Sequence, residues 1–365
     1  MAEALKHVYS PDYITTLANQ LSAIASSFDR KAFVDCVFDD QWDDRELKAR
    51  MRHVSLCFHQ FLPADFAKAT KRLRQIADLE RPGKYRSLAD MCFPDFVQVY
   101  GLEDPDISFP ALAHLSCFSS SEFAIRPFII QYPEIAMAQM RVWATDENHH
   151  IRRLASEGCR PRLPWAMALP VFKKDPSPIL PILELLKTDA SDYVRRSVAN
   201  NLNDIAKDHP EIVLGIGKKW IGTHKDTDWI VKHASRSLLK QGHPKALALF
   251  GFTKNPQLTL DGPHLSTHEL SIGEYFRFTF SLKVTHTSEV KLRLEYGIYY
   301  MKANGSHFRK VFQLSEAKYA PQTQKRFDRK QSFTNLTTRK HYPGLHKLVI
   351  IVNGVEMKEV AFELK

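Results

Sequence analysis

The sequence predicts a multidomain protein in which an α-helical solenoid is followed by a small β-sandwich. Apolar residues recur at helical spacing through roughly the first two thirds of the chain and alternate with polar residues near its C-terminus. The length is consistent with two domains, because 365 residues with 44% apolar content are enough for two substantial cores. We predict a helical domain over residues 1–252 and a strand-rich domain over residues 258–365.

The N-terminal part has helical signals from Ser10 to about Leu115. Ser10 is a candidate N-cap followed by Pro11, and the segment from Asp43 to Leu62 places apolar residues at 3.6-residue spacing. Proline and glycine interrupt the pattern at intervals that suit short connections between helices. The expected breaks are at Pro63, Pro82-Gly83, Pro94 and Pro105.

The middle of the chain repeats one helical unit. If Ile125, Ile151, Val194 and Ile230 are one recurring position, the spacings are 26, 43 and 36 residues. The later two lie near the length of a HEAT-type two-helix repeat, so the pattern predicts a HEAT-like solenoid. Other helices of these repeats begin with or near proline, which is tolerated in a first helical turn. They are expected in residues 133–144, 177–187 and 210–222.

Near Gly251 the composition changes to β-branched and aromatic residues. Asn353-Gly354, between two apolar alternations, is a strong signal for a hairpin turn. Strands at this spacing within roughly 100 residues predict an immunoglobulin-like sandwich, although the cysteine pair of antibody domains is missing. The expected strands lie in His268–Val284, Glu289–Met301 and His346–Lys365.

The charge of the chain favours a polyanionic partner, since the net charge is +10 and the pI is near 9.2. Nucleic acid is the commonest such partner, but charge alone does not separate it from an acidic protein or a membrane surface. Part of the charge falls in a segment of the strand-rich domain that we expect to be a loop. This segment is either a solvated surface or a second contact to a phosphate backbone. Its basic residues are Lys325, Arg326, Arg329, Lys330, Arg339 and Lys340.

Several classes of protein are not indicated. The five cysteines lack C-x-x-C spacing, so we expect reduced thiols rather than a disulfide framework or a zinc site. The segment MAEALKHVYS has no apolar core, and no run of about 18 apolar residues occurs, so we expect neither secretion nor membrane insertion. Phosphate-loop, nucleophile-elbow and H-E-x-x-H motifs are absent, and His149 and His150 do not share a helix face. We therefore expect no nucleotide, metal or other cofactor.

Acidic residues accompany the arginines of the repeat helices. Arg153 and Glu157 share one ridge, because they are four residues apart on a helix that begins near Asn148. In the alignment, Arg153 corresponds to Arg196 and Lys232, Glu157 corresponds to Asn200 and Arg236, and Asp204 and Lys240 lie one turn further. Carboxylates on a DNA-binding surface would repel phosphates, which predicts another role for them. The alternative is ordinary exposed ion pairs, Arg153 with Glu157 and Asp204 with Lys207.

Glu122 and Trp165 also have two interpretations each. Ser119-x-x-Glu122 has the form of a capping box, a structural role that does not exclude a second one at an exposed helix start. Trp165 follows two prolines, directly after the helix that ends at Gly158. Its indole either fills a core or is carried by the loop to a place beside Glu157.

Four segments of the chain carry a further signal: residues 93–106, residues 109–129, and the blocks IRRLASEGCRPRLPW and VRRSVANNLNDI. Together they resemble the AlkC branch of the AlkC/AlkD DNA glycosylases. The resemblance covers about residues 1–250, with SSSEFAIRPF and ASEGCRPRLPW as its specific parts, and the strand-rich tail is similar to the immunoglobulin-like domain of some members. It implies a HEAT-like solenoid that binds alkylated double-stranded DNA and hydrolyses the bond between deoxyribose and an N3-methylated base, with 3-methyladenine and 3-methylcytosine as substrates.

The resemblance also implies site residues. Those that match positions around the lesion sugar are Glu122, Glu157, Asp204 and Trp165. Those placed as DNA contacts are Arg152, Arg153, Arg195, Arg196, Lys232, Arg236 and Lys240. The expected function is monofunctional, cofactor-free base excision by a monomer in the bacterial cytoplasm, associated with the nucleoid when bound to DNA. The alternative is a non-catalytic HEAT-Ig scaffold that binds DNA or an acidic protein.

The chemistry fits these residue types. A cationic N3-methylated base leaves as a neutral molecule and needs no general acid. Positive charge then develops at the anomeric carbon of the sugar, where carboxylates stabilise it and orient water. An indole adds cation–π attraction to the same charge.

Overall fold

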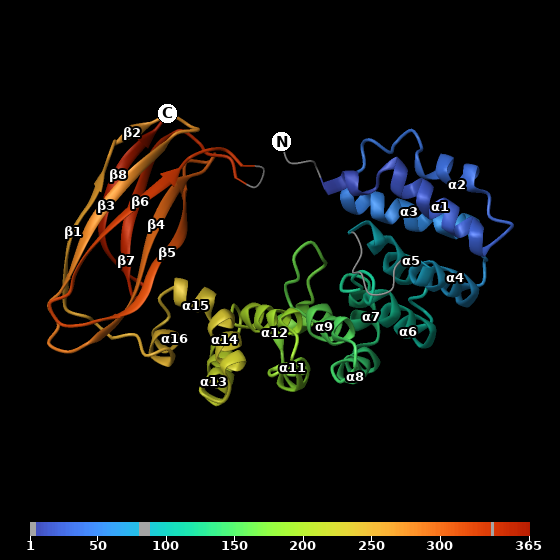
Figure 1. Cartoon of the computed structure of the whole chain (residues 1–365), viewed down its shortest axis with the longest axis horizontal. Helices are drawn as coiled ribbons and strands as arrows, with labels where there is room; N and C mark the ends of the chain where they lie inside the picture. Colours follow the sequence, from blue (N-terminus) through green and yellow to red (C-terminus); the bar gives the residue numbers. More distant parts are fainter. Residues whose placement is uncertain (1–4, 80–87, 337–338) are drawn as a thin grey trace. The chain divides into compact units, whose positions relative to one another are not determined.

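The computed structural model describes residues 5–79, 88–336 and 339–365, and it divides into two compact units (Figure 1). Unit 1 comprises residues 1–208 and 222–234, and unit 2 comprises residues 209–221 and 235–365. The helical part ends at Leu249 and the first strand begins at Leu258, so helices precede strands as predicted. The predicted break at Pro82-Gly83 lies outside the described residues.

Unit 1 is built from helices. They are η1 (Leu5–Val8), α1 (Pro11–Ile24), α2 (Arg30–Val37), α3 (Leu47–Phe61), α4 (Phe66–Leu79), η2 (Leu88–Met91), α5 (Cys92–Tyr100), α6 (Pro105–Ser116), α7 (Ile125–Gln131), α8 (Pro133–Trp143), α9 (His149–Gly158), α10 (Pro170–Lys174), α11 (Leu180–Leu186), α12 (Asp192–Ile205) and α14 (Lys225–Ala234). The predicted cap at the start of α1 is confirmed, because the Ser10 hydroxyl accepts a hydrogen bond from the Tyr13 amide at 3.1 Å. Pro94 does not break a helix; it lies in the first turn of α5, where its missing N–H has no helical partner.

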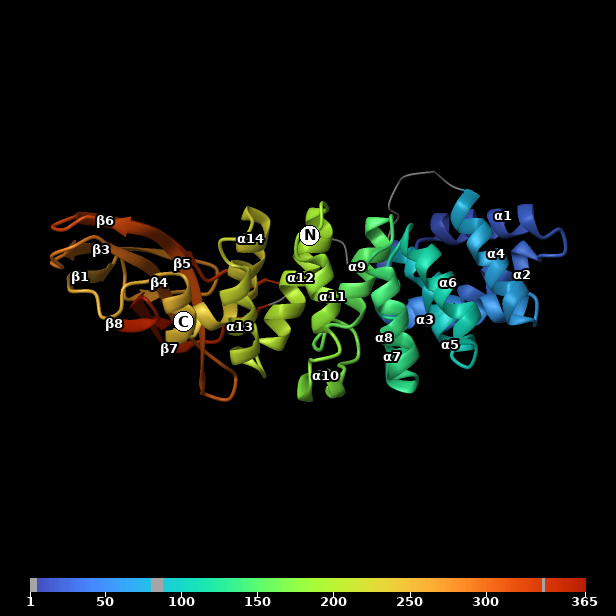
Figure 2. The ribbon, with the colours of Figure 1, turned by 90° about the horizontal axis from the view of Figure 1, so that it is seen from below.

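The helices α9, α12 and α14 follow one another in unit 1, with α12 packed against both of the others (Figure 2). At the predicted recurring position Val194 and Ile230 are buried, whereas Ile151 on α9 is partly buried. Leu154, one turn further along α9, is buried. Gly158 ends α9 where the helix approaches its neighbours closely. A Cβ there would lie 2.7 Å from a methyl carbon of Ile125 on α7 and 2.9 Å from the terminal methyl carbon of Met140 on α8.

Unit 2 contains three helices and two antiparallel-rich sheets. The helices are α13 (Pro210–Trp220), α15 (Arg236–Lys240) and α16 (Pro244–Leu249). The strands are β1 (Leu258–Leu265), β2 (Glu269–Leu270), β3 (Tyr275–Val284), β4 (Val290–Met301), β5 (His307–Tyr319), β6 (Gln324–Ser332), β7 (Gly344–Val352) and β8 (Val355–Leu364). One sheet has the order β1-β3-β6 and the other β2-β8-β7-β4-β5.

The two sheets share one apolar core and so form a sandwich. Phe276, Phe278 and Phe280 of β3 alternate into this core, where they meet residues of the second sheet such as Leu294 and Leu348. The predicted hairpin turn is confirmed, because Asn353 and Gly354 connect β7 to β8 with φ angles of 46° and 80°. A two-residue turn with both φ angles positive matches the twist of the strands it joins.

The structure corrects the expected basic loop. Lys325, Arg326, Arg329 and Lys330 lie on strand β6, which is paired with β3. In sequence the segment resembles a loop, because charged residues occupy both alternating faces of what is a strand. Only two of its side chains are buried, those of Phe327 and Gln331, since β6 lies at the edge of its sheet. Among the described residues of this cluster, Arg339 and Lys340 follow β6 outside the named strands.

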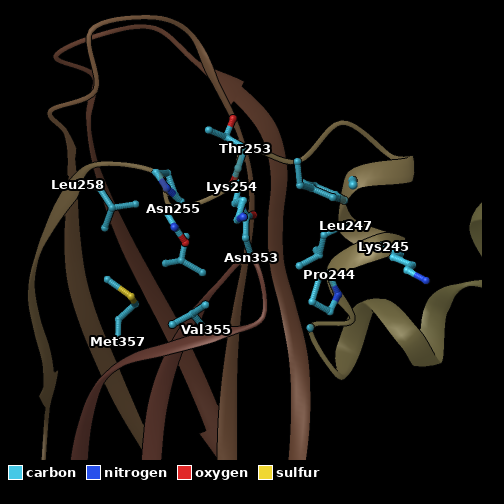
Figure 3. A pocket seen from close by; sticks show the side chains of 15 residues that line it. Pro244, Lys245, Leu247, Thr253, Lys254, Asn255, Leu258, Asn353, Val355 and Met357 are labelled. Carbon is cyan, nitrogen blue, oxygen red and sulfur yellow. The ribbon is translucent and has the colours of Figure 1, made fainter.

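An apolar hollow of about 630 Å³ lies in unit 2 beside helix α16 (Figure 3). Leu247, Leu258, Val355 and Met357 are among its lining residues. The connection between α16 and β1 is fastened to the sandwich at this place, because the Asn353 side-chain amide donates to the backbone oxygen of Thr253 at 2.9 Å. In the described parts of the chain, no helix has both the length and the apolar character needed to cross a membrane.

Candidate active site

Three acidic residues predicted as site residues are joined through two arginines. Arg153 contacts both Glu122 and Glu157, the latter with 3.5 Å between Nη2 and Oε1. Arg160 donates from Nη1 to Oε1 of Glu157 at 2.6 Å and from Nε to Oδ2 of Asp204 at 2.9 Å. We call these five residues the carboxylate network. It links the segment before α7, the C-terminal half of α9 and the C-terminal half of α12.

Three members of the carboxylate network are buried and the other two are partly buried, which corrects the expectation of exposed ion pairs. Glu157 is 5% exposed, Asp204 2% and Arg160 7%. Both alternative pairs do form, since Lys207 lies 3.2 Å from Asp204 and Arg153 contacts Glu157. Yet Arg160, two residues after the end of α9, makes the shorter contact with each acid. Ionised groups are buried only with such partners, because removing a charge from water costs several kcal/mol.

The acidic residues of the network raise the pKa of Arg160. Burial lowers the pKa of this guanidinium, but the negative charges of Glu157 and Asp204 and the hydrogen bonds to them outweigh burial, so the pKa lies above its ordinary value. Arg160 therefore remains a cation between the two carboxylates. Sequence inspection did not single out this residue.

Two serines hold the second oxygen of Glu157. The Ser197 hydroxyl on α12 donates to Oε2 at 2.6 Å, and the Ser156 hydroxyl on α9 donates to the Ser197 oxygen at 2.7 Å. Asn201 adds a hydrogen bond to the backbone oxygen of Ser156 at 2.8 Å. Sequence reasoning missed these residues, although a signal exists. Ser197 takes the place in its repeat that Leu154 occupies in the preceding one, and a polar residue in an apolar stripe requires a buried partner.

Glu122 does not form the expected capping box. Helix α7 begins at Ile125 with Ala124 at its N-cap position, so Glu122 lies before the helix rather than in its first turn. The carboxylate of Glu122 instead accepts hydrogen bonds from the Ser120 hydroxyl and from Arg153. The guanidinium of Arg153 also lies over the Tyr193 ring, 4.9 Å from its centroid. The contact of Glu122 with α9 thus overrides the local capping signal.

Trp165 is exposed, so the interpretation that it fills a core is wrong. Its side chain is 58% exposed and its φ angle is +66°, a left-handed conformation that costs energy for a residue other than glycine. Its backbone oxygen accepts a hydrogen bond from Lys48 on α3 at 2.8 Å. Trp165 and Phe123 line the same small hollow, which places the indole beside the segment that carries Glu122.

Arg126 anchors the segment that carries Arg160 and Trp165. This arginine of α7 is fully buried and donates to the backbone oxygens of Met167, Gly158 and Arg160 at 2.6, 2.8 and 2.9 Å. Burial lowers its pKa to about 10. Because it binds both ends of residues 158–167, Arg126 restricts the conformations of this loop. The sequence motif contained it, but its role depends on residues more than 30 positions away.

Two of the predicted DNA contacts serve the fold. Arg152 binds Asp189 through two hydrogen bonds of 2.6 and 2.9 Å and also donates to the backbone oxygens of residues 146 and 147. Arg195 repeats this pattern one unit later, donating to the backbone oxygens of Asp189 and Ala190 at 2.7 and 2.9 Å. Each arginine thereby closes the start of its own helix. Their guanidinium groups are largely engaged within the protein.

The remaining predicted contacts differ in exposure. Arg196 is 66% exposed in its side chain and pairs with Asp192 at 2.7 Å. Lys232 lies on α14, whereas Arg236 and Lys240 lie on α15. The predicted single ridge through these three residues is therefore interrupted, because α14 ends at Ala234 and Ser235 has a ψ angle of 0°. Lys240 is exposed, and Lys232 and Arg236 are partly buried.

In residues 5–79, 88–336 and 339–365, no group of three or more histidine, cysteine or acidic side chains is arranged to hold a metal ion. His149 and His150 lie at the start of α9 with their ring centroids 4.2 Å apart. Burial, followed by the charges of His149 and Arg153, lowers the pKa of His150 to about 4.

Comparison with known proteins identifies the family of both parts. A family model described as DNA alkylation repair enzyme matches residues 115–238, and one described as the C-terminal Ig-like domain of uncharacterised protein YhaZ matches residues 259–365. Uncharacterized protein YhaZ of Bacillus subtilis is 41% identical over 360 residues, which are 99% of each chain. A solved structure of the alkylpurine DNA glycosylase AlkC of Pseudomonas fluorescens, bound to DNA containing an abasic site analog, is 36% identical.

The structural match to AlkC has a TM-score of 0.94 and covers all of both chains. Together with the matching family models, it confirms the predicted order of a HEAT-like solenoid and an immunoglobulin-like domain. The chain belongs to the AlkC branch of the AlkC/AlkD family of DNA alkylation repair glycosylases, in the subtype with a C-terminal immunoglobulin-like domain.

Proposed function

We propose that this protein hydrolyses the N-glycosidic bond of cationic N3-alkylated bases in double-stranded DNA, with 3-methyladenine and 3-methylcytosine as substrates. The observation that carries the proposal is the carboxylate network, in which Glu122, Glu157 and Asp204 converge from three segments of the chain. An N3-alkylated base already carries a positive charge, so it departs as a neutral molecule. The reaction therefore requires stabilisation of the sugar rather than protonation of the base.

The three acids supply that stabilisation. Glycosidic bond cleavage passes through an oxocarbenium-like sugar, and fixed carboxylates close to the developing charge lower its energy without reorganising. One of the acids also orients and deprotonates the attacking water. We assign this water to Glu157 because Ser156 and Ser197 hold its carboxylate in one orientation.

Three cations set the resting charge of the network. Arg153 and Arg160 within it, and Lys207 beside Asp204, balance the formal charges of the three acids before the lesion arrives. When positive charge develops on the sugar, a carboxylate shared with an arginine can shift its interaction toward the sugar. Such a paired site tolerates burial in the free protein and still offers negative charge in the transition state.

Trp165 contributes through its exposed indole. We propose that the ring lies against the sugar or the lesion base, since its 58% exposure leaves a face available and Arg126 restrains its loop. A cation over an indole face gains about 0.5–2 kcal/mol. The same attraction would favour a cationic base over a neutral one.

DNA binding is proposed for the cations that remain accessible. Arg196 and Lys240 are exposed, and the partly buried Lys232 and Arg236 precede Lys240 by eight and four residues. The net charge of +10 and the DNA complex of the related AlkC support this partner. We further propose that the protein acts as a monomer without a cofactor, on chromosomal DNA in the bacterial cytoplasm.

Chromatography of bases released from methylated duplex DNA tests the proposal. The purified protein is expected to release free 3-methyladenine and 3-methylcytosine and to leave normal bases in place. The Glu157→Gln variant, incubated at the same concentration, should bind the DNA and release neither base at a comparable rate. A protein that binds this DNA but releases no methylated base at enzyme excess would instead be a non-catalytic scaffold.

A further inference from the structure

A pair of cysteines lies outside the carboxylate network. The structure describes all five cysteines, each as a free thiol. The sulfur atoms of Cys36 on α2 and Cys57 on α3 lie 2.9 Å apart. A disulfide bond needs a separation of about 2.05 Å. The two thiols are therefore within a small side-chain adjustment of covalent contact.

The surrounding helices hold the pair in place. Nε2 of His53, one turn before Cys57 on α3, lies 3.1 Å from the backbone oxygens of both Cys36 and Val37. The end of α2 is thereby tied to α3 at the level of the two sulfurs. Phe33 of α2 also stacks on Phe58 of α3, with ring centroids 5.7 Å apart. The approach of Cys36 to Cys57 is thus built into the packing of these helices.

The two thiols differ in access to solvent. Cys36 is partly exposed, whereas Cys57 is 1% exposed. Burial and the contact with Cys36 together raise the pKa of Cys57 well above its ordinary value. A small oxidant from solution therefore reaches Cys36 first, and Cys57 reacts only with a partner that is already beside it.

We propose that Cys36 and Cys57 form an oxidant-sensitive dithiol that closes to an intramolecular disulfide when the protein meets a hydroperoxide. The thiolate of Cys36 attacks one oxygen of the peroxide, the O–O bond breaks, and Cys36 becomes a sulfenic acid while the second oxygen leaves as water or an alcohol. The sulfur of Cys57 then attacks the Cys36 sulfur, the S–O bond breaks, and the Cys57 proton leaves with the hydroxyl group as water. Two thiols lose two electrons, and the peroxide gains them.

The first step prepares the second. Conversion of the Cys36 thiol to a sulfenic acid gives its sulfur a leaving group, and the Cys57 sulfur already lies 2.9 Å from it. The resulting bond would connect two helices whose cysteines are 21 residues apart in sequence, which constrains the unfolded chain.

Peptide mapping of the full-length protein tests the proposal. The reduced protein is treated with hydrogen peroxide, remaining thiols are blocked, and tryptic peptides are analysed without reduction. Cleavage after lysine and arginine separates residues 32–45 from residues 53–68, so a disulfide joins two peptides that are otherwise independent. We expect this joined species, lighter by two hydrogens than the sum of its parts, and its disappearance after dithiothreitol.

Three variants complete the test. Cys36→Ser and Cys57→Ser should each abolish the joined peptide, whereas Cys117→Ser, the matched control with a similarly half-buried thiol, should form it as the wild type does. Oxidation of Cys36 to a sulfinate with Cys57 still free would overturn the proposal. So would a disulfide that joins Cys36 to another cysteine or to a second molecule.

Discussion

Ser197 donates its hydroxyl hydrogen bond to Oε2 of Glu157 at 2.6 Å, from the middle of α12 to the last turn of α9. This contact joins two consecutive repeats at the acid that we assign to the attacking water. The opposite oxygen of Glu157 contacts Arg153 and Arg160. Both carboxylate oxygens of Glu157 therefore have partners within the protein before DNA binds.

Removal of the serine hydroxyl should slow base release. A hydrogen bond to a charged group contributes about 1.5–3 kcal/mol, so we expect Ser197→Ala to lower the single-turnover rate about tenfold or more. DNA affinity should not change, because Ser197 is 2% exposed. Ser197→Thr, which keeps a hydroxyl, should recover part of the rate. An unchanged rate in Ser197→Ala would show that Glu157 does not depend on this contact.

Loss of the negative charge at Glu157 should affect catalysis more than binding. Glu157→Gln keeps the size of the side chain, and we expect DNA affinity to be retained while the excision rate of 3-methyladenine falls by orders of magnitude. The reason is that the carboxylate acts on a charge that exists only in the transition state. Single-turnover kinetics measure the rate and fluorescence anisotropy measures the affinity. Normal excision by this variant would remove Glu157 from the mechanism.

Arg160 should be essential for stability because two buried acids depend on it. Breaking a buried ion pair from one side typically costs about 3–5 kcal/mol, and we expect a loss of this size in the free energy of unfolding of Arg160→Met. Urea denaturation measures it. The matched control is Arg162→Met, because Arg162 pairs with Asp208 at 2.6 Å in a partly exposed position and should contribute no more than about 1 kcal/mol.

The double replacement Glu157→Gln with Asp204→Asn offers a second check on Arg160. In that background the carboxylates are neutral amides, so removal of the arginine no longer leaves two buried negative charges. We expect Arg160→Met to cost clearly less there than in the wild type. Equal costs in both backgrounds would mean that Arg160 stabilises the fold through packing rather than through its charge.

The arginines of α12 should separate DNA binding from folding. We expect Arg196→Ala to weaken binding to all duplex sequences and to reduce the slope of log affinity against log salt by about 0.9, the value for one phosphate contact. Arg195→Ala, its neighbour, should instead lower the melting temperature, because its guanidinium binds the start of the helix. Titrations at several salt concentrations, with thermal unfolding in parallel, distinguish the two. A loss of affinity in Arg195→Ala alone would contradict this assignment.

His150 should make stability depend on pH. Its pKa is lowered to about 4 in the folded protein, mainly by burial, from an ordinary value of 6.5. Between these values the unfolded chain binds more protons than the folded one, so stability is full above pH 6.5 and is lost as the pH falls toward 4. We expect the melting temperature of His150→Gln to fall less than that of the wild type between pH 7 and pH 5. Parallel curves for the two proteins would exclude His150 as a source of the dependence.

Local signals in the sequence predicted much of the fold. The Ser10 cap, the apolar stripes of α9 and α12 and the Asn353-Gly354 hairpin depend on residues that are close together in the chain, and all three are present. The predicted boundary between residues 252 and 258 stays a prediction, because unit 2 also includes helices before it. Strand β6 was not recognised, since an edge strand exposes most of its side chains and resembles a charged loop in composition.

The candidate site likewise has features that are local in the sequence and features that depend on distant residues. The sequence alone determined that acids and arginines alternate along the repeat helices, because a helical period and a repeat length are properties of the chain itself. Only the tertiary structure decided that Glu157 and Asp204 are buried, that Arg160 lies between them and that Ser197 orients one of them. Asp204 is 44 positions from Arg160, and Ser197 is 40 from Glu157. Burial and pairing over such separations follow from how the helices pack, which no local pattern of residues specifies.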